Sequence, residues 1–511
     1  MKNIITRILT LLATVFCLAA EADAQLAMDA PKRELRAVWL TTINGLDWPD
    51  TKATSPAGIE RQKQELRNIL DKLKAANFNA VIFQTRIRGT VVYPSQIEPW
   101  DGCLTGRFGQ APGYDPLAFA VEECHRRGMQ IHAWVVAVPG NKSAQIKALG
   151  AQALGKRVPQ LVIKTNEGNM LDPGQPGTAD YIASICEEIV RGYDIDGLNF
   201  DYLRYPEKEI SFNDAATYRR YASVGQSLAD WRRENISRLV ETIHRRVKAI
   251  KPWVALSCSP VGKYADTRRY PAGGWNALNA VSQDAKLWLR EGWMDILMPM
   301  QYFRGRHYYP FLLDWQEDAA GRTIASGLGV YQIDRQQQNW PLSEMESQIS
   351  YCRRYGVGGQ VFFRSRFVTD NTKGIYNLLR YNLYRTRALP PAIDNKRSAP
   401  PTPVNARIEE TPSGYTLRWE AAEACRYVLY RSNTYPVDTE DANNIYKVRL
   451  TEPQFTISLP LLEGWLPYYA VTAIDRYGHE SAPLEINKER KIRTFVPLEI
   501  NKEKKISTLK H

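Results

Sequence analysis

One carboxylate is set apart by its place in the sequence. Asp201 ends the run Gly-Leu-Asn-Phe-Asp, in which apolar Leu198 and Phe200 alternate with small or polar residues. This period of two predicts a β-strand with one apolar and one polar face. Tyr202 and Arg204 follow directly. Polar side chains at the carboxyl end of an inward-facing strand are typical of barrel enzymes. We therefore predict that Asp201 is a catalytic carboxylate.

The chemistry of Asp201 depends on its surroundings. Aromatic walls would desolvate the carboxyl, raise its pKa and make it a general acid. Arg86 or Arg204 nearby would instead favour a charged nucleophile or stabiliser, and the sequence leaves both roles open. Glycoside hydrolysis usually uses two carboxyl groups. We predict Asp172 as the second, although other acids follow predicted strands: Asp47, Asp266 and Asp334.

The remaining candidate residues would bind substrate. They share positions on predicted strands or at the strand ends, and they are mostly aromatic or basic: Trp39, Arg86, His132, Trp134, Tyr202, Arg204, Gln301, Tyr302 and Tyr331. This composition suits a carbohydrate better than a phosphate ester, because the sequence has no Gly-rich phosphate loop. For His132, a buried and hydrogen-bonded histidine is the competing interpretation. No two histidines have metal-ligand spacing and no CxxC pair is present, so we predict no metal and no cofactor.

Strands and helices alternate through residues 33–388. The predicted strands are 36–43, 79–86, 130–138, 195–205, 254–260, 294–302, 323–331 and 358–365. The predicted helices are 58–76, 115–128, 178–193, 225–250, 284–291, 343–355 and 372–384. Eight strands alternating with helices predict a (β/α)8 TIM barrel of the α/β class. A doubly wound open sheet is the alternative, but it requires a Gly-rich turn after the first strand, which residues 41–45 do not provide.

The pattern changes after the barrel. Five prolines between 390 and 403 indicate a stiff linker at residues 389–401. Short alternating strands over residues 402–483 predict a small β-sandwich. This segment resembles a fibronectin type III domain, including the ending Ala473-Ile-Asp-Arg-Tyr-Gly-His-Glu-Ser481, and such a domain would offer a surface to an envelope protein. Residues 484–511 form a basic tail, in which the segment 483–492 recurs at 497–506.

The amino-terminal residues 1–24 have the features of a signal peptide. A basic end, an apolar run from Ile8 to Ala20 and a small-x-small site at Ala22-Asp23-Ala24 follow one another. Cys17 raises lipoprotein anchoring as an alternative, but bulky Phe16 before it disfavours that reading. We predict export to the periplasm or the medium, with no transmembrane segment later in the chain.

The formal net charge of +12 favours contact with polyanions. For an exported chain, an anionic envelope polymer is a more plausible partner than nucleic acid. A basic surface that is only solvated, without a partner, is nevertheless the preferred interpretation.

Short motifs recur at the predicted strands and the loops beside them, including Arg36-Ala-Val-Trp-Leu40, Phe83-Gln-Thr-Arg86, Leu171-Asp-Pro-Gly174, Phe200-Asp-Tyr202 and Gly327-Leu-Gly-Val-Tyr331. Together these motifs resemble the glycosyl hydrolase-like family 10 barrels of bacterial envelopes. The resemblance covers residues from about 33 to 385, and it implies a TIM barrel that hydrolyses glycans, in some relatives peptidoglycan glycan strands.

The sequence departs from related patterns at some positions. Asp172 stands where Asn is common in the family, and residues 135–138 read Val-Val-Ala-Val instead of Phe-Asn-Pro-Tyr. Chitinase-like barrels carry DGxDxDxE, whereas this chain has Asn199 and Leu203 at the second and last acidic places. The substrate-assisted mechanism of that group therefore does not transfer to this chain.

These observations predict an exported glycoside hydrolase that acts on a cell-envelope polysaccharide, with peptidoglycan glycan strands as one such substrate. A non-catalytic carbohydrate-binding protein on a degenerate barrel is the first alternative. A scaffold whose sandwich domain binds a partner protein is the second.

Overall fold

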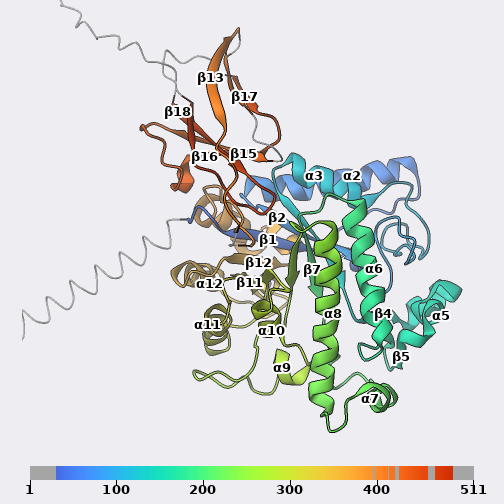
Figure 1. The fold of residues 1–511 in the computed structure, drawn as a ribbon. Helices are drawn as coiled ribbons and strands as arrows, with labels where there is room; N and C mark the ends of the chain where they lie inside the picture. Colours follow the sequence, from blue (N-terminus) through green and yellow to red (C-terminus); the bar gives the residue numbers. More distant parts are fainter. Residues whose placement is uncertain (1–29, 395–396, 413, 421–424, 459–466, 487–511) are drawn as a thin grey trace, which may run out of the picture.

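The computed structural model describes residues 30–394, 397–412, 414–420, 425–458 and 467–486. Within these residues a large α/β body is followed by a smaller all-β body (Figure 1). The predicted signal peptide, with Cys17, lies outside the described residues, as does the tail beyond Ile486.

The large body is a closed parallel barrel. Its sheet order is β10-β9-β8-β7-β3-β2-β1-β12-β11. The strands β10 and β11 are the two halves of one strand on either side of Ala325, and they pair with β9 and β12 respectively, so the sheet closes on itself. The bounds are β1 Leu35–Leu40, β2 Ala80–Arg86, β3 Gln130–Val136, β7 Gly197–Asp201, β8 Ala255–Cys258, β9 Ile296–Leu297, β10 Thr323–Ile324, β11 Ser326–Leu328 and β12 Gly359–Phe363. The predicted TIM barrel is confirmed, and the open-sheet alternative is excluded.

Helices surround the barrel, and their starts follow from local sequence. Ser55 caps α2 by accepting a hydrogen bond from Gly58 N–H, and Asp115 caps α3 in the same way, each with proline at the next position. The predicted helices correspond to α2 Pro56–Ala75, α3 Pro116–Arg126, α6 Pro176–Gly192, α8 Leu228–Ile250, α10 Ala285–Arg290, α12 Leu342–Arg354 and the short α14 Ile375–Leu378. The structure adds α7 Ala215–Tyr221, α11 Tyr309–Glu317 and α13 Ser365–Thr369, which the sequence analysis did not predict.

The alternation in β7 divides the inside of the barrel from the outside. Leu198 and Phe200 join the large apolar core between the sheet and the helices. Asn199 points the other way, into the barrel, where its Oδ1 accepts hydrogen bonds from Trp39 Nε1 at 3.3 Å and Ser259 Oγ at 3.1 Å. The polar layer that the sequence predicts inside the barrel is therefore present, directly below the end of β7.

A small antiparallel sheet is inserted after β3. It consists of β4 Pro139–Lys142, β5 Val162–Thr165 and β6 Gly168–Leu171, in the order β4-β6-β5. The sequence analysis placed only a long loop here, because strands of four residues leave almost no periodic signal. The insertion extends from the carboxyl ends of the strands beside β7, and it forms part of the candidate site.

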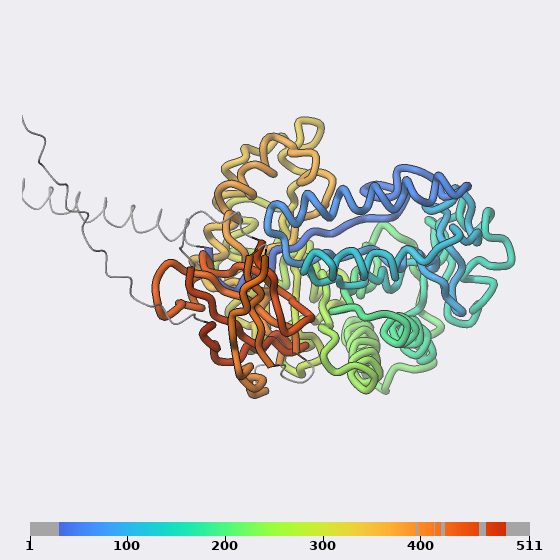
Figure 2. Tube along the Cα trace, turned by 90° about the horizontal axis from the view of Figure 1, so that it is seen from above, coloured from blue at the N-terminus to red at the C-terminus, as the bar shows by residue number. Residues whose placement is uncertain are grey.

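The smaller body consists of two antiparallel sheets. One contains β13 Val404–Thr411, β14 Gly414–Glu420 and β17 Gln454–Ser458, and the other contains β15 Arg426–Ser432, β16 Ile445–Leu450, β18 Tyr468–Ile474 and β19 Leu484–Ile486. Trp419 and Tyr427 meet in its core with ring centroids 5.2 Å apart, as the sequence predicts for core residues. This β-sandwich packs beside the ends at which the barrel strands begin (Figures 1 and 2).

Candidate active site

Asp201 ends β7 with a carboxyl that is only 8% exposed. Burial raises its pKa to about 6, although Arg204, the backbone N–H of Tyr202 and the indole of Trp134 act in the opposite direction. The Tyr202 N–H donates to Asp201 Oδ1 at 2.8 Å. At pH 7 a carboxyl with this pKa is protonated in about a tenth of the molecules, against less than about a thousandth at the usual value of 3.8, so burial makes Asp201 a far better general acid.

The backbone is strained next to this carboxyl. Tyr202 has a φ of 51°, in the left-handed region that bulky side chains rarely adopt. Such a conformation costs of the order of 1 kcal/mol or more, and it persists where the surroundings impose it. Here the strained residue is the one whose N–H donates to Asp201 and whose ring packs on Arg204.

Arg204 joins two aromatic rings and a second carboxyl. Its guanidinium carbon lies 4.6 Å from the ring centroid of Tyr202 and 5.8 Å from that of Trp275. Its Nη2 lies 2.6 Å from Glu207 Oε1. Trp275 is 39% exposed, which is unusual for this side chain. The sequence analysis missed Trp275, although a Trp after Gly273-Gly274 in a loop beyond the fifth strand is a detectable signal.

Glu207 differs from Asp201 in its ionisation. Burial opposes its charge, but the hydrogen bond and the charge of Arg204, together with the more distant Arg88, lower the pKa of Glu207. The pKa values of Asp201 and Glu207 are thus shifted in opposite directions around one arginine. This pattern separates an acid from an ionised carboxylate in one site.

A cavity of about 320 Å³ lies between Tyr202, Glu207 and the inserted sheet. Arg88 also lines it, and the guanidinium of Arg88 has no hydrogen bond or ion pair among the residues that the structure describes. Its charge nevertheless lowers the pKa values of Asp201 and Glu207. An unpaired guanidinium at the edge of a cavity is suited to bind a carboxylate of a ligand.

Aromatic side chains form the other wall of the barrel mouth. Tyr302 stacks on Phe363 with centroids 5.5 Å apart and an interplanar angle of 24°. Tyr331 meets Tyr302 edge-on at 5.8 Å, and Trp39 meets Phe363 at 6.2 Å. Burial, and then the charge of Asp201, raise the pKa of Tyr302, which places this ring beside the carboxyl. The structure thus brings Trp39, Trp134, Tyr202, Arg204, Tyr302 and Tyr331 together around Asp201.

Two other predicted binding residues, Arg86 and Gln301, lie in the barrel wall, where their polar atoms form hydrogen bonds within the protein. Buried Arg86 forms a two-point ion pair with Glu98, with both N–O distances 2.8 Å, and donates to the carbonyl of Ala137 at 2.9 Å. Gln301 is fully buried and accepts from Ser326 Oγ at 3.2 Å.

His132 lies near the other end of the barrel. It pairs in register with Gly197, whereas Asp201 pairs with Val136 four residues further along β3. Burial lowers the pKa of His132 to about 4, so the ring is neutral at ordinary pH. Its Nε2 lies 3.3 Å from Gln130 Oε1, and its Nδ1 has no partner among the described residues.

Asp172 is surrounded by other residues than those around Asp201. Its carboxyl accepts hydrogen bonds from Thr217 Oγ1 at 2.6 Å and Gly174 N–H at 2.9 Å, and burial raises its pKa. The charges that act on it are Asp214 and Arg232, which are not those that act on Asp201.

Three further acids that follow strands are also used in protein contacts. Asp47 accepts from Thr41, Asp266 from Ala272 N–H and Asp334 from Gln336 N–H. Glu207 was not among the predicted partners, because it follows Pro206 in a loop of no recognisable pattern. Among the described residues no group of three or more His, Cys, Asp or Glu side chains is arranged to hold a metal ion.

The family model for glycosyl hydrolase-like 10 matches residues 34–340. The chain belongs to this family. Over 94% of its length it is 31% identical to "Glycosyl hydrolase YngK" of Bacillus subtilis (strain 168), of which 98% is covered. It is 32% identical to "Glycosyl hydrolase DigH" of Escherichia coli (strain K12) over 65% of this chain and 83% of that protein. A solved structure, the PgaB (BpsB) glycoside hydrolase domain from Bordetella bronchiseptica, aligns with 68% of this chain and 98% of that one at 16% identity and a TM-score of 0.48.

The predicted class of enzyme is therefore confirmed at the level of the glycosyl hydrolase-like 10 family. The matched region runs from β1 to Trp340 and contains Asp201, Glu207 and Trp275. It ends before β12 and the β-sandwich, so the fibronectin type III resemblance remains a prediction. No helix in the described part of the chain is both long enough and apolar enough to cross a membrane.

Proposed function

We propose that the chain is an exported glycoside hydrolase that cleaves a cell-envelope polysaccharide, with peptidoglycan glycan strands as its first expected substrate. The observation that supports this proposal is the opposed direction of the pKa shifts of Asp201 and Glu207, since the charge of Arg204 acts on both and Arg204 pairs with Glu207. Membership of a glycosyl hydrolase-like family supports the reaction class. The predicted signal peptide supports export.

In this mechanism Asp201 donates its proton to the glycosidic oxygen as the bond from that oxygen to the anomeric carbon breaks. Glu207 carries the negative charge that stabilises the cationic sugar ring. Water then bonds to the anomeric carbon and gives its proton to the Asp201 carboxylate, which restores the acid. The rings of Tyr202, Tyr302 and Trp275 hold sugar faces. Binding of substrate over Asp201 excludes water and strengthens these electrostatic effects.

Arg88 supports an acidic substituent on the substrate. Its guanidinium lines the cavity beside Glu207 without a partner among the described residues. Peptidoglycan glycan strands carry a carboxylate on alternate sugars when the peptide stems are removed. Such a carboxylate would pair with Arg88 while the neighbouring sugar lies over Asp201.

The test uses purified mature protein and peptidoglycan glycan strands, with released oligosaccharides identified by mass spectrometry. Asp201→Asn and Glu207→Gln should each lower kcat by about 10²–10⁴-fold, the usual effect of losing an acid or base. Asp266→Asn is the matched control, because Asp266 is an exposed carboxyl beyond the fifth strand whose Oδ1 caps Ala272 N–H, and it should retain wild-type activity.

Asp172→Asn tests whether Asp172 is the second catalytic carboxyl group, as the sequence analysis predicted. Wild-type turnover by both Asp201→Asn and Glu207→Gln would overturn the proposed mechanism. Binding of glycan without any released product would instead support the alternative of a carbohydrate-binding protein.

A further inference from the structure

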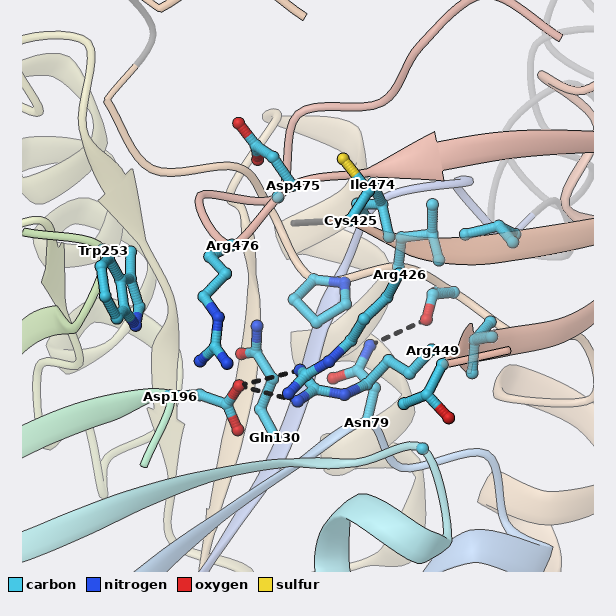
Figure 3. A pocket seen from close by; sticks show the side chains of 18 of the residues that line it. Asn79, Gln130, Asp196, Trp253, Cys425, Arg426, Arg449, Ile474, Asp475 and Arg476 are labelled. Carbon is cyan, nitrogen blue, oxygen red and sulfur yellow. Dashed lines mark hydrogen bonds and ion pairs between the residues drawn. The ribbon is translucent and has the colours of Figure 1, made fainter. Parts of the chain in front are cut away.

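A second cavity, of about 470 Å³, lies between the barrel and the β-sandwich (Figure 3). Its barrel side is built from residues at the beginnings of strands, including Gln130 of β3 and Asp196 just before β7. Asp201 ends β7, so this cavity is at the opposite end of the barrel from the candidate active site. Its volume lies within the range of about 300–1,000 Å³ that is typical of small-molecule sites.

The cavity combines equal numbers of opposite charges. Three arginines from the sandwich domain share it with two aspartates of the barrel and one of the sandwich: Arg426, Arg449, Arg476, Asp194, Asp196 and Asp475. A strongly charged ligand would have to displace an ion pair and would leave one charge uncompensated. A neutral ligand with many hydroxyl groups avoids this cost, because each hydroxyl donates to a carboxylate and accepts from a guanidinium.

Some polar groups in this cavity can form further hydrogen bonds. Arg426 reaches Asp194 at 3.5 Å and Asp196 at 3.6 Å, which are long contacts for charged groups. Arg449 holds Asp196 more closely, at 2.8 Å. The side-chain nitrogen of Gln130 has no hydrogen-bond partner among the described residues. A ligand can therefore gain hydrogen bonds here without breaking the interface between the two bodies.

Trp253 adds a flat apolar surface to these polar groups. Its ring lies on the barrel side of the cavity, and the guanidinium carbon of Arg476 lies 5.2 Å from the ring centroid (Figure 3). An aromatic ring beside planar amide, carboxylate and guanidinium groups is the usual composition of a sugar subsite, because the ring stacks on the C–H face of a pyranose while the planar groups bind its hydroxyls.

We propose that this cavity binds a neutral oligosaccharide segment of a glycan, as a non-catalytic site remote from Asp201. The competing explanation is an ion-pair cluster that only fixes the sandwich to the barrel. The proposal does not depend on the catalytic roles of Asp201 and Glu207, because the two sites share no lining residue.

Cys425 offers a direct probe of this cavity. It lines the cavity and is partly exposed, whereas the other five cysteines of the described residues are buried. A thiol reagent at mildly alkaline pH should therefore label Cys425 first, and Cys425→Ser should abolish the fast phase. The experiment follows this labelling in the full-length Asp201→Asn protein, which removes turnover, with chitotetraose or cellotetraose as the added probe.

One of these tetrasaccharides is expected to slow the labelling of Cys425 in a saturable way. Trp253→Ala and Arg426→Ala should each raise the half-protecting concentration by about tenfold or more. Trp253→Phe keeps a ring and should retain most of the protection, which separates loss of binding from loss of folding. Arg431→Ala is the matched control, because Arg431 is an exposed arginine of the same strand outside the cavity.

Absence of protection by both sugars would overturn the proposal, as would equal protection in Trp253→Ala and in the parent protein. Protection by sulfate or citrate but not by sugars would also overturn it, in favour of an anion site. Failure to hydrolyse any glycan, with sugar protection of Cys425 intact, would contradict only the proposed catalytic function.

Discussion

Replacing Asp201 by asparagine is expected to stabilise the folded protein at alkaline pH. The carboxyl is 8% exposed, and burial raises its pKa from 3.8 to about 6. A raised pKa in the folded state means that the ionised form is the costly one. Asparagine has a similar shape, is neutral at every pH and keeps an oxygen to accept the Tyr202 N–H.

The size of the effect follows from this difference in pKa. Between pH 3.8 and 6 the folded state binds more protons than the unfolded chain, so the free energy of unfolding falls as pH rises. Below 3.8 both states are protonated and the stabilisation is complete, and above 6 it is lost. The difference of about 2.2 units corresponds to about 3 kcal/mol at pH 8. At pH 4 the same calculation leaves only about 0.5 kcal/mol.

The assay is thermal unfolding of wild type and Asp201→Asn at pH 4 and pH 8, with the barrel and sandwich transitions resolved by calorimetry. At pH 8 the barrel transition of the variant should rise by about 3–6 °C, and at pH 4 by about 1 °C or less. Asp266→Asn, at an exposed carboxyl, should show no such pH dependence. An equal shift at both pH values, or a variant less stable at pH 8, would refute burial as the cause of the raised pKa.

Three other substitutions separate structural from functional roles. Arg86→Ala should destabilise the barrel by about 3–5 kcal/mol in urea unfolding, because it leaves the buried Glu98 carboxylate with only the more distant Arg157, at 3.8 Å, as an ion-pair partner; retained stability with raised KM would instead make Arg86 a binding residue. Trp275→Ala should raise KM about three- to tenfold with little change in kcat, because in the proposed function the ring binds a sugar face and takes no part in the proton transfer. Asp172→Asn should keep activity within about tenfold, because Thr217 and the backbone already use its carboxyl; a loss of kcat of the size expected for an acid or base would restore Asp172 as the catalytic partner.

The barrel was predictable because its strands carry a periodic signal. The alternation of Leu198 and Phe200 with polar residues identified β7, and proline after a capping residue placed the start of α3. The inserted sheet β4-β6-β5 was not predictable in the same way. Its strands have four residues each; β5 and β6 form a short hairpin, but β4 pairs with β6 between segments that are distant in sequence.

The candidate site was predictable where it depends on strand ends and not where it depends on loops. Asp201 and Tyr202 could be placed from β7 alone. Glu207 and Trp275 lie in loops without a periodic signal; Glu207 is only three residues from Arg204, whereas Trp275 approaches Arg204 only through the fold. For Arg86 the strand-end rule was misleading. Its position at the end of β2 suggested a substrate contact, but its guanidinium pairs with Glu98, twelve residues away in a loop.

The two aspartates at the ends of β7 show how one strand serves opposite purposes. Asp196 lies just before the strand, where burial is outweighed by Arg449, His125 and the N–H of Ile131, and these groups hold its pKa well below the usual range. Asp201 is more deeply buried and has no ion pair of its own among the described residues, because Arg204 pairs with Glu207 and Arg88 acts only from further away, so burial prevails and its pKa rises. Ionised Asp196 therefore supports the contact between barrel and sandwich, whereas Asp201 at neutral pH is held at a cost in stability. A fold retains such a cost where function requires the proton, which is the physical reason to place the chemistry at Asp201.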